Sequence, residues 1–519
     1  MNAIAPSQVP AAPDTDDAGR DLRTVARGGL LNMVGAGGNA VFTFLIFVVI
    51  ARAVDLRQVG ALLVAIAAFT ILTTGSQFGA QVGLVRMIAR YRVLGRVSDI
   101  RHTLLVGLTP VLVTGAAMAA AGYALAGQFA ALLGRGEDAE LVVRYLHLLV
   151  PFIPFAALLA VAAGATQGFG TMLPAVAVDK IGRTVTQLGL TVLTVGLGSV
   201  AIALAWATPY ALGLVAISGW LVVLLRRTER QASGDPARPL PQLAREFWRF
   251  SAPRGVASFF QVSVLWFDTI LLGVLRSTQE AGIYAVATRY LTIGHLVIGA
   301  ILQVTGPKLS ELLAAKSQDR ASSVYQAATC WVTALVWPVY FTVGVFAPFL
   351  LQVFGREFVA GQTALLILAG AMLIAAVSGP VDVVLLMGGK SWWSLVNWGM
   401  AFVVNVVLNL VLIPSHGING AAIAWAVSIL VRNLIPVVEV WLLMGLHPVG
   451  EGLRKVMVAS TVSFGVVGVV LRSAFGASLT TFTILLAVGT TTYAAMLWRH
   501  RDVVLGKGLT ARRATVSRD

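Results

Sequence analysis

Apolar stretches of about twenty residues recur along almost the whole chain, separated by short polar segments. A helix of about twenty residues spans the hydrocarbon of a bilayer, so each stretch predicts a membrane-spanning helix. The strands of an outer-membrane barrel would instead alternate over about ten residues, and the sequence shows no such alternation. The stretches lie at residues 28–51, 59–79, 104–126, 142–165, 171–197, 200–225, 253–275, 281–306, 325–352, 362–387, 392–414, 418–444, 456–474 and 479–498. This pattern predicts an all-α integral membrane protein of about 14 transmembrane helices.

The composition excludes a soluble domain. Of the 519 residues, 57% are hydrophobic and 12% are charged, whereas a soluble domain carries about 25% charged residues. So few charges cannot cover a surface that faces water. The single cysteine, Cys330, excludes a disulfide framework and a multi-cysteine metal site, and we expect it to be a small apolar residue within a helix.

Lysine and arginine are concentrated in alternate loops, which predicts the orientation. With both termini in the cytoplasm, about 27 of the 38 basic residues fall in cytoplasmic segments and about seven in outer loops. The fourth loop is the exception, because it has no basic residue. This placement explains the net charge of +15 without a nucleic-acid partner. We therefore expect a multi-pass protein of the cytoplasmic (inner) membrane with both termini inside.

An internal repeat of about 220 residues indicates two lobes. Leu133-Gly134-Arg135 matches Phe354-Gly355-Arg356, and Gly60 matches Gly282. We predict a disordered cytoplasmic tail at 1–24, with no signal peptide, and an N-terminal lobe of six helices at 25–227. A cytoplasmic linker at 228–250 would lead to a second lobe of six helices at 251–446. Two further helices at 447–500 and a basic cytoplasmic tail at 501–519 complete the division.

Three sequence motifs carry a family resemblance that extends over about residues 28–500. They are Asn405-Val-Val-Leu-Asn409-Leu-Val-Leu-Ile-Pro414 with Gly417-Ile-Asn-Gly420-Ala-Ala-Ile-Ala424, then Asp268-Thr-Ile-Leu-Leu-Gly273 with Gly282-Ile-Tyr284 and Arg289, then Gly306-Pro-Lys-Leu-Ser310. In these motifs the chain resembles the polysaccharide-transporter (oligosaccharide flippase) branch of the multidrug/oligosaccharidyl-lipid/polysaccharide (MOP) exporter superfamily. The N-terminal half matches more loosely, with Ala51-Arg52 and Gly60 in family-like positions.

The resemblance implies a V-shaped bundle of two six-helix lobes plus two C-terminal helices. It also implies a flippase, whose cargo is a glycan linked to a polyprenyl (pyro)phosphate and carried to the outer leaflet. Membrane lipids are then partners, and the resemblance leaves glycan-assembly enzymes open as further partners.

Four basic residues lie inside predicted helices: Lys180, Arg183, Arg289 and Arg432. At 1.5 Å per residue, Arg183 is about 18 Å from the cytoplasmic end of its helix, and Arg432 is about 20 Å from the outer end of its own. Charges at such depth are costly and usually functional. Arginine offers a fork of donors to phosphate, whereas lysine acts as a point charge. We therefore predict that these residues bind the anionic cargo in a central cavity.

Pairing within the protein is the alternative role for these cations. Asp179 precedes Arg183 by four residues, which allows an ion pair on one helix face, and Asp268 could pair with Arg289 between two helices. The same two carboxylates are candidates for a coupling ion, H⁺ or Na⁺. Four cations against two carboxylates leave a net positive interior in either case.

Polar residues could add contacts to the sugar. Asn405 and Asn409 share one helix face and could bind sugar hydroxyls or join helices. Arg52 is expected to be an interfacial anchor, and His295 a packing residue. Asp382 and Glu439 are expected near the cytoplasmic interface.

Other functions are less well supported by the sequence. No Walker motif, metal-ligand spacing or nucleophile motif is present, so we expect no metal, no cofactor and no enzyme activity. A glycan-assembly enzyme would need larger loops than this chain has. A MATE-type drug/cation antiporter would need a deep carboxylate, and residues 32–50 of the first helix have none. A peptidoglycan lipid-precursor flippase shares the expected mechanism and stays an alternative.

Overall fold

The computed structural model describes residues 15–132, 137–230 and 238–500, and these residues are helical with short connections and no β-strand. The all-α prediction is therefore confirmed. The first half contains α1 Thr15–Ala53, α2 Leu56–Gln77, α3 Ala80–Val93, α4 Val97–Ala124, α5 Ala126–Ala131, α6 Glu137–Leu149, η1 Val150–Phe152, α7 Ile153–Gly168, η2 Ala175–Gly182, α8 Arg183–Thr194, η3 Val195–Leu197 and α9 Ser199–Glu229.

The second half begins after the gap at 231–237. It contains α10 Leu240–Leu275, α11 Thr278–Ala287, η4 Thr288–Leu291, α12 Thr292–Ala314, α13 Gln318–Val345, α14 Ala347–Gln352, η5 Arg356–Gly361, α15 Gln362–Val377, α16 Val381–Met387 and α17 Ser391–Met444. It ends with α18 Glu451–Ser460, η6 Thr461–Val466, α19 Val467–Phe475 and α20 Leu479–Arg499. We call α2–α9 the first lobe and α11–α17 the second lobe.

The described residues include 12 helices long and apolar enough to cross a membrane. One of them, α17, is two helices that meet at a kink at Gly417, where the backbone has a φ of 52°. The segment from η2 through α8 is a further helical piece in which a π-helix precedes an α-helix. Counting α17 twice and adding this segment gives the fourteen predicted stretches, all of which are helical.

Two predicted segment boundaries differ from the structure. Helix α1 begins at Thr15, inside the stretch that we expected to be a disordered tail; residues 1–14 and 501–519 lie outside the described part. The predicted linker 228–250 is largely helical, since α9 ends at Glu229 and α10 begins at Leu240. The reason is that Leu243, Phe247 and Ser251 recur every four residues and are buried. Phe247 and Ser251 pack at the start of α3, where Gly79 and Gly83 leave room for them.

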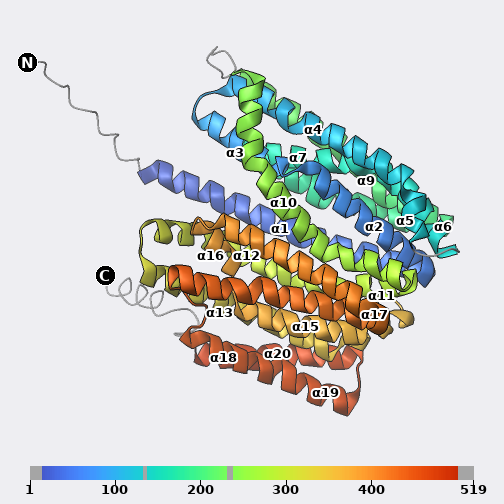
Figure 1. Cartoon of the computed structure of the whole chain (residues 1–519). Coiled ribbons are helices and arrows are strands. Elements are labelled where there is room, and N and C mark those ends of the chain that lie inside the picture. The colour runs from blue at the N-terminus through green and yellow to red at the C-terminus, as the bar shows by residue number, and fades with distance from the viewer. Residues whose placement is uncertain (1–14, 133–136, 231–237, 501–519) are drawn as a thin grey trace, which may run out of the picture.

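The lobes lie on either side of α1 and α10 (Figure 1). Away from these two helices, they pack together chiefly where α2 meets α11. Gly60 of α2 faces Gly282 of α11 so closely that a Cβ on Gly282 would lie 2.9 Å from the Gly60 Cα. A Cβ on Gly60 would overlap the Thr278 carbonyl oxygen. The two glycines that the internal repeat aligns are thus the two that join the lobes.

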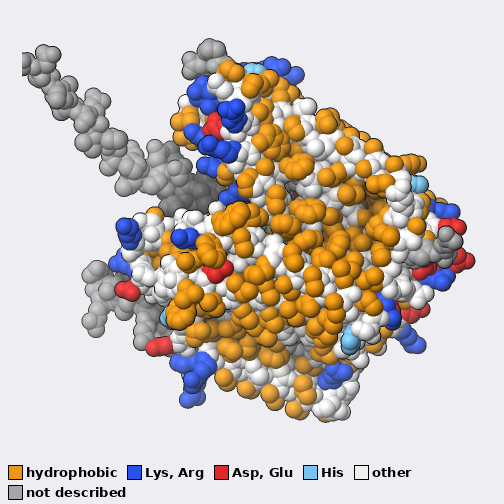
Figure 2. Space-filling model, viewed as in Figure 1, with side chains coloured by type: hydrophobic (Ala, Val, Ile, Leu, Met, Phe, Trp, Pro, Cys, Tyr) orange, Lys and Arg blue, Asp and Glu red, His pale blue; other side chains and the backbone are white. Residues whose placement is uncertain are grey.

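The surface has an apolar middle and charged ends (Figure 2). We call the end where α3 is followed by α4, and α9 by α10, the basic end, because Arg90, Arg92 and Arg96 lie there. The opposite end carries the starts of α6 and α11. This distribution is what a bundle needs if hydrocarbon surrounds its middle and water its two ends.

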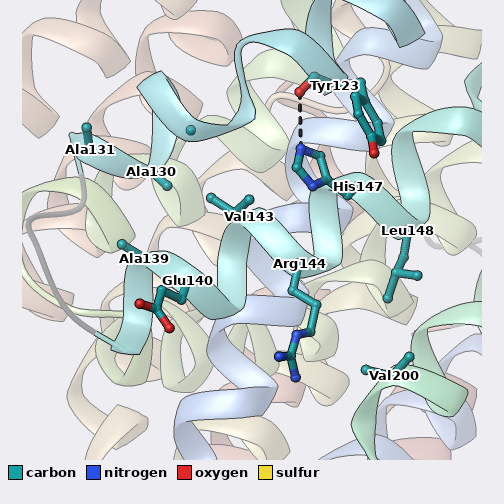
Figure 3. Close-up of a pocket in the computed structure, with 11 residues that line it drawn as sticks. Tyr123, Ala130, Ala131, Ala139, Glu140, Val143, Arg144, His147, Leu148 and Val200 are labelled. Atoms are coloured by element: carbon teal, nitrogen blue, oxygen red, sulfur yellow. Dashed lines mark hydrogen bonds between the residues drawn. The ribbon is translucent and has the colours of Figure 1, made fainter.

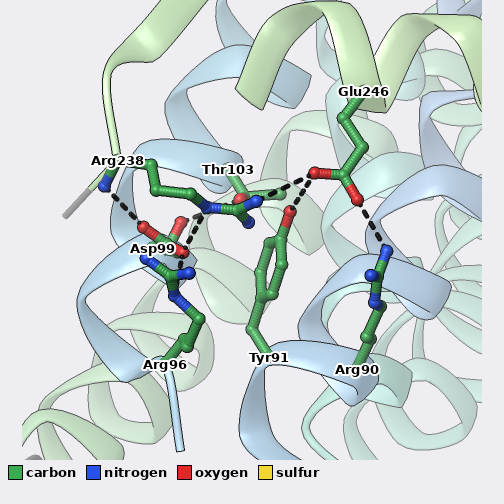
Figure 4. A network of polar contacts seen from close by, with 7 residues as sticks. All are labelled: Arg90, Tyr91, Arg96, Asp99, Thr103, Arg238 and Glu246. Carbon is green, nitrogen blue, oxygen red and sulfur yellow. Dashed lines mark hydrogen bonds and ion pairs between the residues drawn. The ribbon is translucent and has the colours of Figure 1, made fainter. Parts of the chain in front are cut away.

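A polar network at the basic end fixes the start of α10 to the first lobe (Figure 4). The carboxylate of Asp99, buried in α4, accepts hydrogen bonds from the backbone N–H and Nε of Arg238, each at 2.8 Å, and pairs with Arg96 at 3.1 Å. Glu246 of α10 accepts from Arg90 at 2.6 Å and from Arg238 at 3.1 Å. Partial burial disfavours the charge of Arg238, but its bonds to Asp99 and the neighbouring acidic charges outweigh this and raise its pKa.

Candidate functional site

Lys180 and Arg183 lie where the π-helix η2 passes into α8, and both reach toward α1. The Lys180 ammonium donates to Asn32 Oδ1 at 2.6 Å, and Arg183 Nη2 donates to Asn39 Oδ1 at 3.4 Å. A π-helix widens the backbone by one residue per turn and often occurs at functional sites. Both cations are therefore held by neutral amide oxygens of a neighbouring helix.

Arg183 has a fuller set of partners than Lys180. Its Nε pairs with Asp179 at 3.1 Å, which is the ion pair that the four-residue spacing allows. Its Nη1 donates to Gln187 at 2.8 Å, and the guanidinium lies 4.9 Å from the ring centroid of Tyr210. The side chain keeps 15% of its surface exposed and also lines a cavity of about 260 Å³ between η2, α8 and α9. One carboxylate, two amides and a ring orient this cation without enclosing it.

Arg289 of η4 lies between two aromatic rings. Its guanidinium is 4.7 Å from the ring of Phe47 on α1 and 4.4 Å from the ring of Trp266 on α10. Its Nε donates to the Ala285 carbonyl at 2.9 Å. The pairing with Asp268 that the sequence left open is absent from the ion pairs of the described residues. Arg289 is thus a cation with no carboxylate among the described partners.

Helix α1 connects these three cations. Asn32, Asn39 and Phe47 fall within about 80° of arc on one face of α1, since each residue turns the helix by about 100°. They are separated by about 10 Å and about 12 Å along the helix axis. Lys180, Arg183 and Arg289 therefore contact one stripe of α1 at three successive depths, from the basic end toward the opposite end. We call this stripe, with its three cations, the α1 ladder.

A glycine allows α1 to approach the first lobe along this stripe. A Cβ on Gly35 would lie 2.7 Å from Val176 and 3.3 Å from the Lys180 side chain. Gly35 lies between Asn32 and Asn39 along α1, about 40° beyond the edge of the stripe. The close packing that it permits is what brings the two asparagines within reach of Lys180 and Arg183.

Asp268 belongs to a separate buried cluster between α10, α11 and α17. It is 1% exposed and accepts hydrogen bonds from the Tyr284 hydroxyl and the Asn409 amide, both at 2.7 Å. Asn405 lies one turn before Asn409, and its backbone carbonyl accepts the same amide. The Oδ1 atoms of both asparagines and the Nδ2 atom of Asn405 are buried and have no hydrogen-bond partner among the described residues. The cluster thus has one carboxylate and, beside it, unpartnered amide groups that contribute two oxygens and one nitrogen.

Arg432 is the fourth predicted cation, and the structure does not join it to the α1 ladder. Its guanidinium lies 4.4 Å from the Trp398 ring, with His295 in its electrostatic neighbourhood. His295 itself contacts the Leu291 carbonyl at 3.1 Å. Arg432 lies on the second lobe, within the second helix of α17.

The remaining polar residues have local partners. The carboxylate of Asp382 accepts from Ser394, and that of Glu439 accepts from Asn397 at 2.6 Å. Arg52 donates from the end of α1 to the Val353 carbonyl at 2.7 Å and to the Gln352 carbonyl at 3.3 Å. Arg52 therefore links α1 to the second lobe at the opposite end. No group of three or more metal-ligating side chains occurs within the described ranges.

Sequence reasoning missed several partners of the cations, chiefly Asn32, Asn39, Tyr210 and Trp266. The two asparagines had a usable signal, because they are polar residues seven positions apart in an apolar helix and must share a face. The aromatic partners had none, because an aromatic residue in a membrane helix is ordinary.

Comparison with known proteins gives a family and a fold. A family model described as polysaccharide biosynthesis protein matches residues 25–313, which are 289 of the 519 residues. The probable low-salt glycan biosynthesis flippase Agl15 of Haloferax volcanii is 29% identical over 223 residues, which cover 41% of this chain and 46% of Agl15. The match therefore spans about half the length of this curated relative.

Two solved structures share the fold. The lipid II flippase MurJ in an inward closed conformation matches with a TM-score of 0.71 at 12% identity, over 92% of this chain and 99% of MurJ. An inward-facing multidrug resistance MATE family transporter of the MOP superfamily matches with a TM-score of 0.65 at 16% identity, over 78% and 94% of the two chains. The expected MOP exporter fold is confirmed.

Proposed function

Because the chain belongs to the polysaccharide biosynthesis protein family, as its match over residues 25–313 shows, we propose that it is a flippase for lipid-linked oligosaccharides. The cargo is a glycan on a polyprenyl (pyro)phosphate, taken from the inner leaflet and released in the outer leaflet. The observation that carries the proposal is the α1 ladder, in which Lys180, Arg183 and Arg289 follow one helix face at three depths.

An anionic head group needs such a path because it must cross about 30 Å of hydrocarbon. Each cation of the ladder has mainly neutral partners, so phosphate oxygens can replace an amide oxygen or lie beside a ring without separating a strong ion pair. The exception is Arg183, whose bond to Asp179 occupies only part of its donor fork. The lipid tail stays in the bilayer while the head group moves from Lys180 toward Arg289. Arg432, Asn405 and Asn409 are the candidates for further sugar contacts.

In the proposed orientation, the protein lies in the inner membrane and its basic end faces the cytoplasm. Both termini then lie inside. The lobes meet at the outer end through Gly60 and Gly282, and rocking about this contact would open the ladder alternately to the two sides. The proposed mechanical basis of this cycle is the predicted division at 25–227, 251–446 and 447–500, in which α1 moves with the first lobe and α10 with the second.

Asp268 is the proposed coupling site. A buried carboxylate beside two unpartnered amide oxygens suits a small cation, because hard cations take oxygen ligands and a buried charge needs compensation. We propose that H⁺ or Na⁺ binds there and relieves the uncompensated charge. Asp179, in contrast, is paired with Arg183, and its proposed role is to orient that cation.

The test is flipping of a fluorescent polyprenyl-pyrophosphate oligosaccharide in proteoliposomes by the full-length protein. Arg183→Gln and Arg289→Gln are each expected to slow flipping about tenfold or more, because a hydrogen bond to a charged group contributes about 1.5–3 kcal/mol. Arg320→Gln, an exposed residue at the basic end, is the matched control and should flip normally. Size-exclusion chromatography would check that the variants remain folded.

Assays of other substrates in the same vesicles distinguish this function from its alternatives. Wild-type rates in both ladder variants would reject the cationic path. Flipping of a peptidoglycan precursor in place of the oligosaccharide would identify the other flippase class. Ethidium efflux without any lipid flipping would identify a drug antiporter and overturn the proposal.

A further inference from the structure

A pocket of about 930 Å³ lies at the opposite end of the first lobe, apart from the α1 ladder (Figure 3). It is formed by α4, α5, α6 and the start of α9, and its polar lining is Tyr123, Glu140, Arg144 and His147. Val143 and Leu148 contribute apolar surface. The volume is at the upper end of the range of about 300–1,000 Å³ for small-molecule sites.

The helix ends locate this pocket at the level of lipid head groups. Helix α4 ends at Ala124 and α9 begins at Ser199, and both ends contribute to the lining, through Tyr123 and Val200. Helices that span a bilayer end near its interface, where tyrosine is enriched. Leu193 and Leu197 next to the start of α9 are more than 70% exposed, as expected for surface covered by acyl chains. The pocket is therefore expected at the level of the lipid head groups, where the spanning helices end.

Two opposite charges line the pocket without pairing with each other. Glu140 and Arg144 are four residues apart on α6, in the order and spacing that favour an ion pair. Their heads are nevertheless separate (Figure 3), and neither has a hydrogen bond or ion pair with the described residues. The other acidic residues at this helix start are engaged, since Glu137 and Asp138 pair with Arg57. Glu140 and Arg144 are thus available to a ligand that has both an anion and hydrogen-bond donors.

Aromatic residues fix the rest of the lining. The rings of Tyr123 and His147 stack with centroids 4.1 Å apart, and His147 Nε2 contacts the Tyr123 carbonyl at 3.2 Å. This contact holds the imidazole in one orientation beside Arg144. The part of the wall formed by Tyr123 and His147 is therefore preformed, which lowers the entropic cost of binding.

We propose that this pocket binds a lipid phosphate whose head group also carries hydrogen-bond donors. Arg144 holds the phosphate oxygens, and Glu140 accepts from the donors next to the phosphate. Two lipids have this chemistry: a phosphatidylethanolamine of the surrounding leaflet, with its ammonium, and a glycan-linked polyprenyl pyrophosphate, with its sugar hydroxyls. In the orientation proposed above, the pocket belongs to the outer leaflet. Binding at this site does not depend on the chain being a flippase.

Native mass spectrometry of the delipidated full-length protein with added defined lipids tests the site. Arg144→Gln is expected to weaken phosphatidylethanolamine binding about tenfold, because the phosphate loses a charge-assisted partner. Glu140→Ala should remove the preference for phosphatidylethanolamine over phosphatidylcholine, whose head group has no N–H donor. Arg356→Gln is the matched control, because Arg356 is also exposed at the opposite end but lies on the second lobe.

Competition with the oligosaccharide lipid distinguishes the two sources. Displacement of phosphatidylethanolamine by the oligosaccharide lipid in wild type, but not in Arg144→Gln, would assign the pocket to the cargo. If phosphatidylethanolamine stays bound when the oligosaccharide lipid is added, the pocket is a site for a resident phospholipid. Equal lipid binding by wild type, Arg144→Gln and Glu140→Ala, with all three folded, would overturn the inference.

Discussion

At the residue scale, Asp268 is the side chain whose surroundings most restrict its role. Its carboxylate receives the Tyr284 hydroxyl and the Asn409 amide, while the Asn405 and Asn409 oxygens have no partner in the described structure. Asp268→Asn removes the negative charge but keeps the size. We expect that a Na⁺ or H⁺ gradient no longer accelerates flipping, because the variant lacks the negative charge that a bound cation would neutralise.

The measurement is flipping in vesicles with an imposed Na⁺ gradient, a pH gradient or neither. Asp319→Asn is the matched control, because Asp319 is an exposed aspartate at the start of α13, and it should respond to the gradient like wild type. Full gradient dependence in Asp268→Asn would exclude Asp268 as the coupling site.

Helical spacing indicated which side chains can meet within one helix but not which meet between helices. The Asp179–Arg183 pair and the shared face of Asn405 and Asn409 follow directly from the period of 3.6 residues. The ring sandwich around Arg289 instead depends on how α1, α10 and η4 cross. Crossing geometry results from ridge packing over whole helices, and a single sequence does not encode it in any local pattern.

At the element scale, α10 connects the two lobes, and its first turns are fixed by Asp99. This carboxylate is 1% exposed and has three hydrogen-bonding or ionic contacts with Arg238 and Arg96. Asp99→Asn is expected to lower the stability by about 2 kcal/mol, because bonds to charged groups are replaced by a weaker amide contact. The melting temperature of the full-length protein in detergent measures this loss.

Lys308→Gln provides the comparison, since its ion pair with Glu311 is exposed on both sides and should contribute little. Equal melting temperatures for Asp99→Asn and Lys308→Gln would mean that the network in Figure 4 does not hold α10 in place.

Helix lengths were predictable at this scale because hydrocarbon thickness sets them. The helical part of the linker was missed, because residues 240–252 contain three charged residues and are too short and too mixed for an apolar stretch of about twenty residues. Their burial becomes evident only when Phe247 and Ser251 pack at Gly83. The π-helix η2 is likewise invisible in the apolar pattern that predicts its segment.

At the scale of the whole molecule, two glycines control whether the lobes can meet. Because a Cβ on Gly60 would overlap Thr278, Gly60→Val must push α2 and α11 apart at the opposite end. Gly219 of α9 has open space around its Cβ, so Gly219→Val is the matched control. The internal repeat aligned Gly60 with Gly282 from the sequence alone, but only the folded chain brings the two together.

We expect Gly60→Val to shift the population toward a state in which the opposite end is open, since closure now carries a steric cost. Spin labels at Glu137 and Arg356, introduced as cysteines after Cys330→Ala, should move apart in Gly60→Val and not in Gly219→Val. If Gly60→Val fails to fold, Gly282→Ala is the milder version, with its Cβ 2.9 Å from the Gly60 Cα. Unchanged label distances in a folded variant would show that the lobes do not close through this contact. A change in the label distances would mean that the lobes rock about this contact. Flipping should then slow, because the state that takes up cargo at the basic end becomes rare.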